Sequence, residues 1–466
     1  MGLTDRQALA ARLAVLALLV LAAATAGAVT GMEPFHRWYY HWAWYPFLIA
    51  LGAGYALRTA SSPLSARLAA SLFFWSAPLW FLFELFNLRL ANWYYVFAAD
   101  TGPVRALAAF TAFATVLPAI YLAYRWVRLA GFAQGLRGPV LPLRRYPGAL
   151  AGAGFAFLAL SLWQPRIFFP LVWGGLTLVL EPWNYRRAPE RSLVGDLAVG
   201  RYDRLAQLAL AGALVGLCWE AFNALAATRW IYTVPGLEGH KLFEMPLPGF
   251  LGFPVFALDC FVGYQALVNL RVAEPGWGGA APSRWNEGRG DGRAATRRPP
   301  VGRIRLLAGG GAAIALGIAV TAGMERWTID STHPELESLP TASETEIRAL
   351  RAAGIRSVDA LAHADPAALA GQEAAGLDLG PARRLVAMAG LTMLRGLGTE
   401  NAAALRSAGI ASICELAGAE PAAVSAAVRA ARSDPRAGSP PRVRVWLRSA
   451  RRACPEPGPG DAARAR

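Results

Sequence analysis

Long apolar stretches run through the first 323 residues of this chain. About 20 apolar residues are needed for a helix to cross the roughly 30 Å hydrocarbon layer of a bilayer. With 55% hydrophobic and only 17% charged side chains, the chain is too apolar for an ordinary soluble protein. We therefore predict an all-α, polytopic membrane helix bundle of about nine spans. The apolar stretches lie near residues 10–30, 43–58, 67–87, 105–127, 147–163, 167–183, 205–226, 248–270 and 304–323.

Arginine is concentrated in alternate loops between these stretches. The fourth, sixth and eighth loops are the richest, at residues 125–145, 186–204 and 271–305. Positively charged loops of membrane proteins stay in the cytoplasm. This pattern predicts a multi-pass protein of the inner (plasma) membrane with a cytoplasmic N-terminus and, after nine crossings, a C-terminal domain outside. It also explains the formal charge of +15 without a nucleic-acid partner.

Two similar halves of the membrane region carry matching polar residues. Glu84 and Glu220 lie 136 residues apart, and Asn87 and Asn223 have the same separation. A shared spacing of this kind indicates an internal repeat. We predict a duplicated core of four plus four spans, in which an even number of crossings gives both units the same orientation.

Each glutamate and its asparagine are three residues apart, so they share one face of a helix. An ionised side chain that faces lipid costs about 2.5 to 3.5 kcal/mol on insertion scales, which favours a position inside the bundle. Asp259, in the eighth apolar stretch, is a third acid without a counterpart in the first half. In the alternative, these acids only hydrogen-bond to a neighbouring helix and hold the two halves together. The predicted polar, candidate catalytic site consists of Glu220, Asn223 and Asp259, assisted by Glu84 and Asn87.

Aromatic residues follow each of the Glu/Asn pairs, and a proline-rich segment, residues 243–254, leads into the eighth span. Irregular backbone at membrane depth lines a cavity or is buried in protein. The aromatic residues can form the mouth of a site or, alternatively, anchor the protein at the membrane interface. The candidate substrate-binding residues are Trp93, Tyr95, Trp230, Tyr232 and Glu244.

Three motifs carry a resemblance to known sequences. They are Trp219-Glu220-Ala221-Phe222-Asn223, Trp230-Ile231-Tyr232-Thr233-Val234-Pro235 and Phe243-Glu244-Met245-Pro246. Together they resemble a group of uncharacterised bacterial polytopic membrane proteins over roughly residues 165–330, which implies no activity. A looser likeness is to integral-membrane carotenoid cyclases and hydratases, whose intramembrane acids protonate isoprenoid double bonds. Their Pro-Glu-Glu type motif is absent here.

Beyond the last apolar stretch lie two units of about 55 residues, aligned by Gly354 and Gly409. Their pattern is similar to the tandem helix-hairpin-helix modules of recombinase and repair proteins, which implies phosphate contact through Gly396 and Gly398 in the second unit. However, residues 331–428 contain seven arginines against eleven acids. A negative charge disfavours a polyanion. The tail is therefore predicted to contact protein, with nucleic acid as the alternative partner.

Three functions fit these observations. As an enzyme, the protein would modify a lipid or isoprenoid with a proton from a buried carboxylic acid. As a transporter, it would use the same acids for proton or cation coupling. As a tether, it would hold DNA or a partner at the membrane through its tail.

No pattern in the sequence predicts a metal or another cofactor, because the five histidines show no ligand spacing. Cys414 and Cys454 can pair if the tail lies in an oxidising compartment, and the sequence leaves this open. The predicted domains are 1–146 and 147–271 (membrane repeats), 272–303 (flexible basic linker), 304–324 (ninth span), 335–454 (tandem helix-hairpin-helix-like domain) and 455–466 (disordered tail).

Overall fold

The computed structural model describes residues 5–234, 240–277, 303–434 and 436–454. Within these ranges the regular structure is almost entirely helical, which confirms the all-α prediction. Most of the predicted linker and all of the predicted disordered tail lie outside the described residues.

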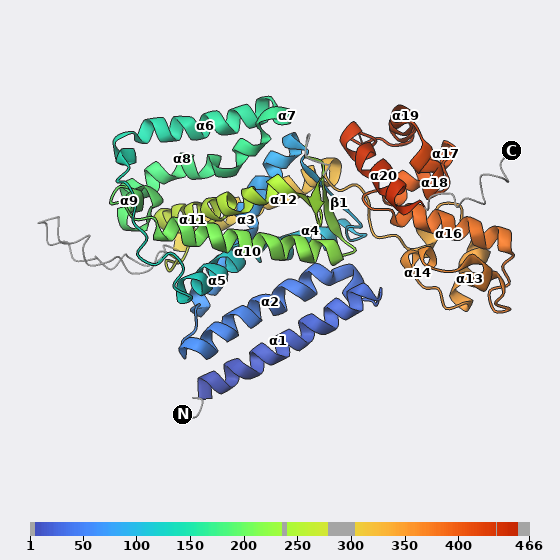
Figure 1. Ribbon diagram of the computed structural model, residues 1–466, viewed down its shortest axis with the longest axis horizontal. Helices are drawn as coiled ribbons and strands as arrows, with labels where there is room; N and C mark the ends of the chain where they lie inside the picture. The colour runs from blue at the N-terminus through green and yellow to red at the C-terminus, as the bar shows by residue number, and fades with distance from the viewer. Residues whose placement is uncertain (1–4, 235–239, 278–302, 435, 455–466) are drawn as a thin grey trace, which may run out of the picture.

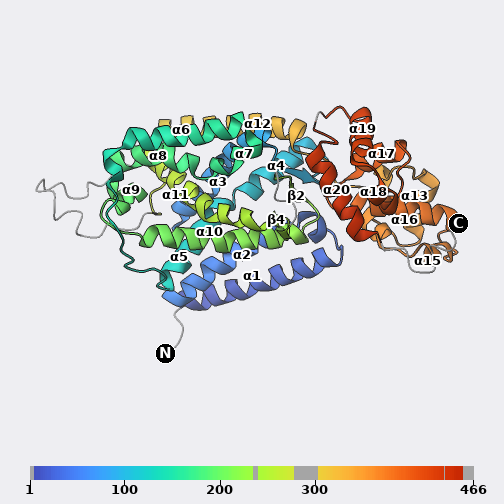
Figure 2. The ribbon, with the colours of Figure 1, turned by 45° about the horizontal axis from the view of Figure 1, so that its top comes forward.

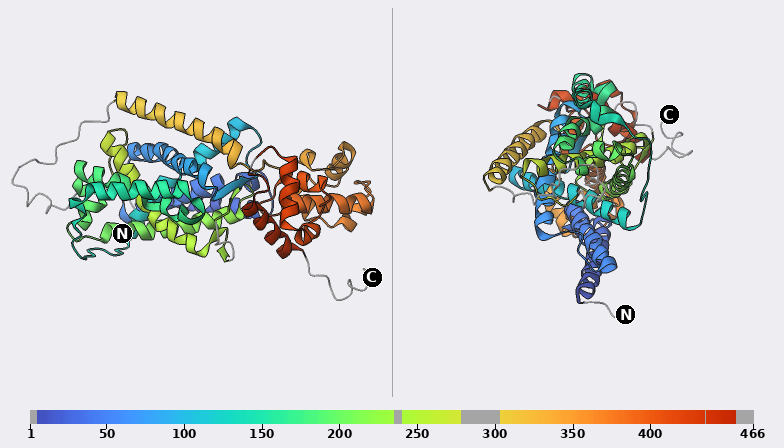
Figure 3. Two further views of the ribbon diagram at one scale, coloured as in Figure 1. Left: turned by 90° about the horizontal axis from the view of Figure 1, so that it is seen from above. Right: turned by 90° about the vertical axis from the view of Figure 1, so that its left-hand side faces the viewer.

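The membrane domain is a bundle of helices that share one long axis, with the C-terminal domain at one end (Figure 1). The hairpin of α1 and α2 projects from one side of the bundle, and α12 lies along another flank (Figure 3). Its helices are α1 (Asp5–Val29), α2 (Phe35–Thr59), α3 (Ala66–Leu90), α4 (Gly102–Phe113), α5 (Val116–Leu129), α6 (Pro147–Trp163), α7 (Pro165–Phe168), α8 (Val172–Arg187), α9 (Leu193–Leu197), α10 (Asp203–Leu225), α11 (Gly252–Leu270) and α12 (Arg303–Trp327).

Six helices among the described residues are long and apolar enough to cross a membrane. A shorter apolar helix, α6, coincides with one more predicted span. The two other predicted spans fall on α2 and α8, which are helical over 25 and 16 residues. The membrane class is thus supported, and the number of nine spans stays a prediction. The six helices of membrane-spanning length are Asp5–Val29, Ala66–Leu90, Gly102–Leu129, Asp203–Leu225, Leu247–Leu270 and Ile304–Trp327.

Two of the predicted spans are interrupted. The fourth is divided between α4 and α5 just before Pro118, whose ring nitrogen cannot donate a helical hydrogen bond. The eighth begins with a tight 3-10 turn at Leu247–Leu251 before α11, so the predicted irregular entry into this span is confirmed.

Strands β1 (Trp93–Val96) and β2 (Arg229–Tyr232) form an antiparallel pair at the end of the bundle nearest the C-terminal domain. Each strand follows a helix that carries one of the two Glu/Asn pairs: β1 follows α3, and β2 follows α10. The chain that leaves α12 runs parallel to β1, with bridges from Tyr95 to Ile329 and from Ala98 to Thr332. A second, smaller pair joins β3 (Lys241–Leu242) to β4 (Met245–Pro246).

The C-terminal domain consists of short helices around its own hydrophobic core. Its first three helices begin at Glu344, Val358 and Pro366, and three later ones begin 55 residues further along in each case. Serine side chains cap several of these helices by accepting a backbone N–H from the residue three positions later. The helices are α13 (Glu344–Ala352), α14 (Val358–Ala362), α15 (Pro366–Ala370), α16 (Leu379–Met393), α17 (Thr399–Ser407), α18 (Ile413–Gly418), α19 (Pro421–Ala431) and α20 (Pro440–Ala453).

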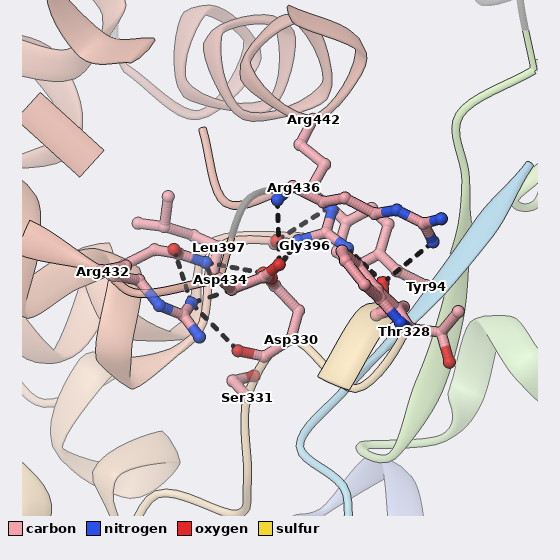
Figure 4. A network of polar contacts seen from close by, with 12 residues as sticks. Tyr94, Thr328, Asp330, Ser331, Gly396, Leu397, Arg432, Asp434, Arg436 and Arg442 are labelled. Atoms are coloured by element: carbon pink, nitrogen blue, oxygen red, sulfur yellow. Dashed lines mark hydrogen bonds and ion pairs between the residues drawn. The ribbon is translucent and has the colours of Figure 1, made fainter. Parts of the chain in front are cut away.

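Helix α20 faces the membrane domain in both Figure 1 and Figure 2. A buried network of polar contacts joins the two domains there (Figure 4). Arg442 pairs with Asp330 at 2.6 Å, and its guanidinium lies 4.6 Å from the ring centroid of Tyr94. Asp330 also accepts a hydrogen bond from Asn401 and lies 3.6 Å from Arg432. Arginines from the basic end of the tail are therefore used inside the molecule.

Cys414 and Cys454 form a disulfide, with their Cα atoms 5.0 Å apart. This bond ties the start of α18 to the residue that follows α20. Cys218 and Cys260, in the membrane domain, are free thiols.

Candidate functional site

Glu84 is fully buried near the end of α3 and accepts three hydrogen bonds on one oxygen. Trp80 and Trp93 donate their indole N–H groups to Oε1 at 2.9 and 3.0 Å. The Tyr95 hydroxyl donates to the same oxygen at 2.5 Å. Within the ranges that the structure describes, Oε2 has no hydrogen-bond partner. The three aromatic donors thus fix the orientation of this carboxyl group.

Glu220 occupies the matching place in α10 and is also fully buried, but it is held by one donor. The Tyr232 hydroxyl donates to Oε1 at 3.0 Å, and Oε2 has no hydrogen-bond partner in the described part of the chain. The indole nitrogen of Trp230 is close to this carboxyl group but makes no hydrogen bond of acceptable geometry. The counterpart of Trp80 is Gly216, which supplies no side chain. The carboxyl group of Glu220 therefore accepts fewer hydrogen bonds than that of Glu84.

The two asparagines bind the backbone at the start of the strands. Asn87 donates to the carbonyl oxygen of Trp93 at 3.0 Å and accepts from the backbone N–H of Asn92 at 2.9 Å and of Trp93 at 3.3 Å. Asn223 donates to the carbonyl oxygen of Trp230 at 2.9 Å and accepts its N–H at 3.0 Å. Each asparagine therefore sets the sharp turn from its helix into the following strand.

The β1–β2 pair brings the two halves together. Trp93 lies opposite Tyr232, and Tyr95 lies opposite Trp230. Successive side chains of a strand point to opposite faces. On one face, these four aromatic residues line a cavity in the membrane domain. On the other face, Tyr94, Val96 and Ile231 belong to the hydrophobic core of the C-terminal domain. The pair is a wall with the cavity on one side and the C-terminal domain on the other.

The cavity has a volume of about 470 Å³ and is lined mainly by apolar and aromatic side chains. Glu220 is the single acidic residue that lines it among the described residues, whereas Glu84 lies behind its three donors and does not line it. Trp80 packs against Phe256 and Trp219 with ring centroids 5.5 and 6.4 Å apart, and Phe256 lies 5.7 Å from Trp173. Aromatic rings therefore surround the space next to Glu220.

Two arginines at the edge of the cavity are neutralised by acids of the protein. Arg37 pairs with Glu335 at 2.6 Å and with Glu33 at 3.2 Å. Arg105 pairs with Glu325 at 2.6 Å. The pairs with Glu335 and Glu325 join the membrane helices to α12 or to the chain just after it, so these cations have structural partners already.

The structure does not bring Asp259 into this group. Its carboxylate accepts the backbone N–H groups of Gly174 and Thr177, at 2.8 and 2.9 Å, and the Thr177 hydroxyl at 2.6 Å. The backbone of α8 is non-helical at Trp173 and Gly174, and the φ of +88° at Gly174 suits glycine. Asp259 thus caps the restart of α8 and does not line the cavity.

Glu244 is also placed outside the cavity lining. It is 1% exposed and pairs with Arg395 of the C-terminal domain at 2.5 Å. Burial lowers the pKa of the neighbouring Arg229, which lies close to both of these charges. Glu244 therefore contributes to the contact between domains.

Gly396 and Gly398 of the tail hairpin lie between α16 and α17 and pack against other parts of the protein. The carbonyl oxygen of Gly396 accepts hydrogen bonds from the Tyr94 hydroxyl at 2.9 Å and from the Trp446 indole at 2.6 Å (Figure 4). A Cβ atom at Gly398 would lie 2.3 Å from the Ser331 hydroxyl oxygen. This hairpin is packed against the protein itself, which leaves little room there for a phosphate backbone.

Several cavity residues were not among the residues predicted from the sequence. Trp80 has a recognisable signal, because it lies four residues before Glu84 and hence on the same helix face. Trp219 directly precedes Glu220 in the motif already noted. Trp173, Phe253 and Phe256 have no such signal, since tertiary packing alone brings them to the cavity. The described residues contain no cluster of ligands suited to a metal ion.

Comparison with known proteins gives one match, in the C-terminal domain. Residues 340–452 are similar to a family described as a domain of unknown function, DUF4332. No curated protein and no solved structure matches the chain. The matched range covers nearly all of α13 to α20, and it is consistent with an uncharacterised C-terminal domain on a membrane protein.

Proposed function

We propose that the membrane domain binds an apolar molecule, a lipid or an isoprenoid, in the aromatic cavity, and that Glu220 acts on it as an acid. One observation carries the proposal: Glu220 is the acid that lines the cavity in the described part of the chain, and its Oε2 has no hydrogen-bond partner. A carboxyl oxygen without an internal partner is free to hold a proton toward a bound molecule.

The chemistry that fits is proton transfer to a carbon–carbon double bond. The proton on Oε2 forms a new C–H bond, the π bond breaks, and the neighbouring carbon becomes a carbocation. Return of a proton from an adjacent carbon to the same carboxylate restores a double bond at a new position or in a new ring. The sequence of steps is an isomerisation, so it needs no oxidant or reductant.

The aromatic walls suit such a reaction. The faces of tryptophan, tyrosine and phenylalanine rings attract positive charge. Trp80, Trp219 and Phe256 present several rings beside Glu220. Burial raises the pKa of Tyr232 well above its usual range, so the phenol stays protonated and keeps donating to Glu220 Oε1.

The fold also supports the proposed placement in a bacterial inner membrane. The C-terminal domain contains a disulfide, which persists in oxidising compartments outside the cytoplasm.

We further propose that the C-terminal domain is a fixed cap behind the cavity wall. Its contacts through Tyr94, Gly396 and Arg442 support this role. They speak against the tether alternative, in which Gly396 and Gly398 would bind DNA. A protein partner on the remaining surface of the domain stays part of the proposal.

The test is deuterium exchange into isoprenoid lipids. The purified full chain in nanodiscs is incubated in D₂O with an isoprenoid lipid extract, and deuterium at carbon is measured by mass spectrometry. We expect incorporation with the wild type and with Glu84→Gln, and at least a hundredfold less with Glu220→Gln, since removal of a general acid typically costs about 10²- to 10⁴-fold.

Equal incorporation with wild type and Glu220→Gln would contradict the acid role. If no lipid exchanges but Glu220→Gln abolishes proton-driven uptake of a solute into vesicles, the transporter alternative replaces the enzyme.

A further inference from the structure

A second pocket lies at the end of the membrane bundle opposite the C-terminal domain, next to the end of α5 (Figure 1). Its volume is about 320 Å³. We call it the tyrosine–arginine pocket. It is lined by Tyr55, Arg125, Arg128, Leu129, Gly276 and Trp277.

Arg125 is held rigidly at this pocket by neutral groups. Its Nη2 donates to the Tyr55 hydroxyl at 2.8 Å, and its Nη1 donates to the Tyr121 hydroxyl at 2.8 Å and to the carbonyl oxygen of Pro63 at 3.1 Å. The guanidinium lies 5.0 Å from the ring centroid of Tyr55. Neither Arg125 nor Arg128 forms an ion pair within the part of the chain that the structure describes.

Trp277 adds an unused donor to the same pocket. It is 1% exposed, and its indole N–H has no hydrogen-bond partner among the described residues. A buried donor without an acceptor costs about 1 to 3 kcal/mol. Such an atom needs an explanation, and a bound ligand is one. The Tyr55 hydroxyl can also donate to a ligand, because it accepts a hydrogen bond from Arg125 and its own proton has no acceptor among the described residues.

The pocket therefore offers two guanidinium groups, an indole N–H and a phenol O–H, without an acid to neutralise them. Guanidinium groups recognise phosphate oxygens through paired, charge-assisted hydrogen bonds. Basic pockets between membrane helices on the cytoplasmic side are suited to anionic lipid headgroups. The positive-inside rule accounts for exposed loop arginines such as Arg144, but it does not explain a buried, unpaired indole beside an immobilised guanidinium.

We propose that the tyrosine–arginine pocket binds a phosphate group, carried by an anionic lipid headgroup or by a soluble phosphate compound. This site is separate from the aromatic cavity, and it does not depend on the activity proposed for Glu220.

Native mass spectrometry of the full chain in neutral detergent, titrated with phosphatidylglycerol or phosphatidylcholine, tests the lipid source. We expect tighter binding of phosphatidylglycerol. Arg128→Gln should weaken it about tenfold, the loss of one charge-assisted contact. Trp277→Phe should weaken it about fivefold, as expected for one neutral hydrogen bond. Arg128 is exposed, so its substitution leaves the fold intact.

Arg144→Gln is the matched control, because it removes one charge from an exposed loop on the same side. It should bind phosphatidylglycerol like the wild type. A parallel titration with inorganic phosphate, followed by thermal stabilisation, tests the soluble source. Stabilisation of the wild type but not of Arg128→Gln, with no preference between the lipids, would assign a soluble phosphate compound. If neither probe distinguishes the wild type from Arg128→Gln, or if Arg144→Gln loses as much binding, the proposed site is refuted.

Discussion

The two halves of the membrane domain bury the same acid in different surroundings. Glu84 receives three aromatic hydrogen bonds on one oxygen and lies behind them, away from the cavity. Glu220 receives one and lines the cavity. Two positions account for the difference: Trp80 in the first half corresponds to Gly216 in the second, and Trp93 donates to Glu84 whereas the indole nitrogen of Trp230 has no acceptor among the described residues. A shared scaffold can therefore hold one acid for structure and place the other at the cavity for chemistry.

The largest expected effect comes from removing the two acids in turn. Glu84→Ala leaves three donors without an acceptor, the buried Trp93 and the half-buried Trp80 and Tyr95, and should reduce the free energy of unfolding by about 4 kcal/mol. Glu220→Ala leaves one and should cost about 1 to 2 kcal/mol. Unfolding in mixed micelles of increasing sodium dodecyl sulfate content measures both. Equal losses of unfolding free energy in the two variants would contradict the proposed difference between Glu84 and Glu220.

Substitution of the asparagines should also cost more unfolding free energy in the first half than in the second, with a smaller difference between the two. Asn87→Ala removes three hydrogen bonds to the chain that enters β1 and should cost about 3 kcal/mol, whereas Asn223→Ala removes two and should cost about 2 kcal/mol. The same micelle titration applies. A larger loss for Asn223→Ala would show that β2 depends more on its turn than β1 does.

The stability of the protein is expected to depend on pH through His333, which contacts Thr228 just before β2. His333 donates to the Thr228 hydroxyl at 2.9 Å, since that hydroxyl gives its proton to the carbonyl oxygen of Phe97. Burial lowers the pKa of His333 to about 3, so between that value and its usual pKa near 6.5 the unfolded chain binds more protons than the folded one.

Stability should therefore fall as the pH drops below about 6, by up to about 1.4 kcal/mol per unit. His333→Gln should flatten this dependence in micelle unfolding measured at several pH values. A pH dependence that persists unchanged in His333→Gln would assign it to another group.

The smallest effect should come from making the first half resemble the second. Trp80→Phe removes one of the three donors to Glu84 while keeping an aromatic ring in the wall, and it should cost about 1 kcal/mol. It should also raise the reactivity of Glu84 toward apolar carboxyl reagents. Unchanged reactivity would show that Trp93 and Tyr95 suffice to protect the carboxyl group.

The all-α fold with helices of membrane-spanning length could be predicted from the sequence, because the length of an apolar stretch reports directly on a bilayer. The paired acids could be found for the same reason, since Glu84 and Glu220 are conspicuous within apolar helices. The roles of the asparagines could not be predicted. A polar residue three positions after a glutamate looks like a partner for it, whereas Asn87 and Asn223 bind the backbone of the following strands.

Contacts between distant segments account for the other differences between the roles predicted for residues and the contacts they make. Asp259 caps α8, which lies more than 70 residues earlier in the chain, and no local pattern reveals this. The glycines of the tail hairpin resemble a phosphate-binding loop, but Tyr94 from the first half occupies the carbonyl oxygen of Gly396. Burial of this kind depends on how domains pack, which a single sequence does not display.

Labelling with dicyclohexylcarbodiimide, an apolar reagent that couples to protonated carboxyl groups, tests the central claim most directly. In the full chain reconstituted in nanodiscs, peptide mapping should find Glu220 modified and Glu84 unmodified, because only Glu220 lines the cavity. Modification of Glu84 at the same rate as Glu220, or of Glu84 alone, would contradict the account of one acid that lines the cavity and one that lies behind its donors.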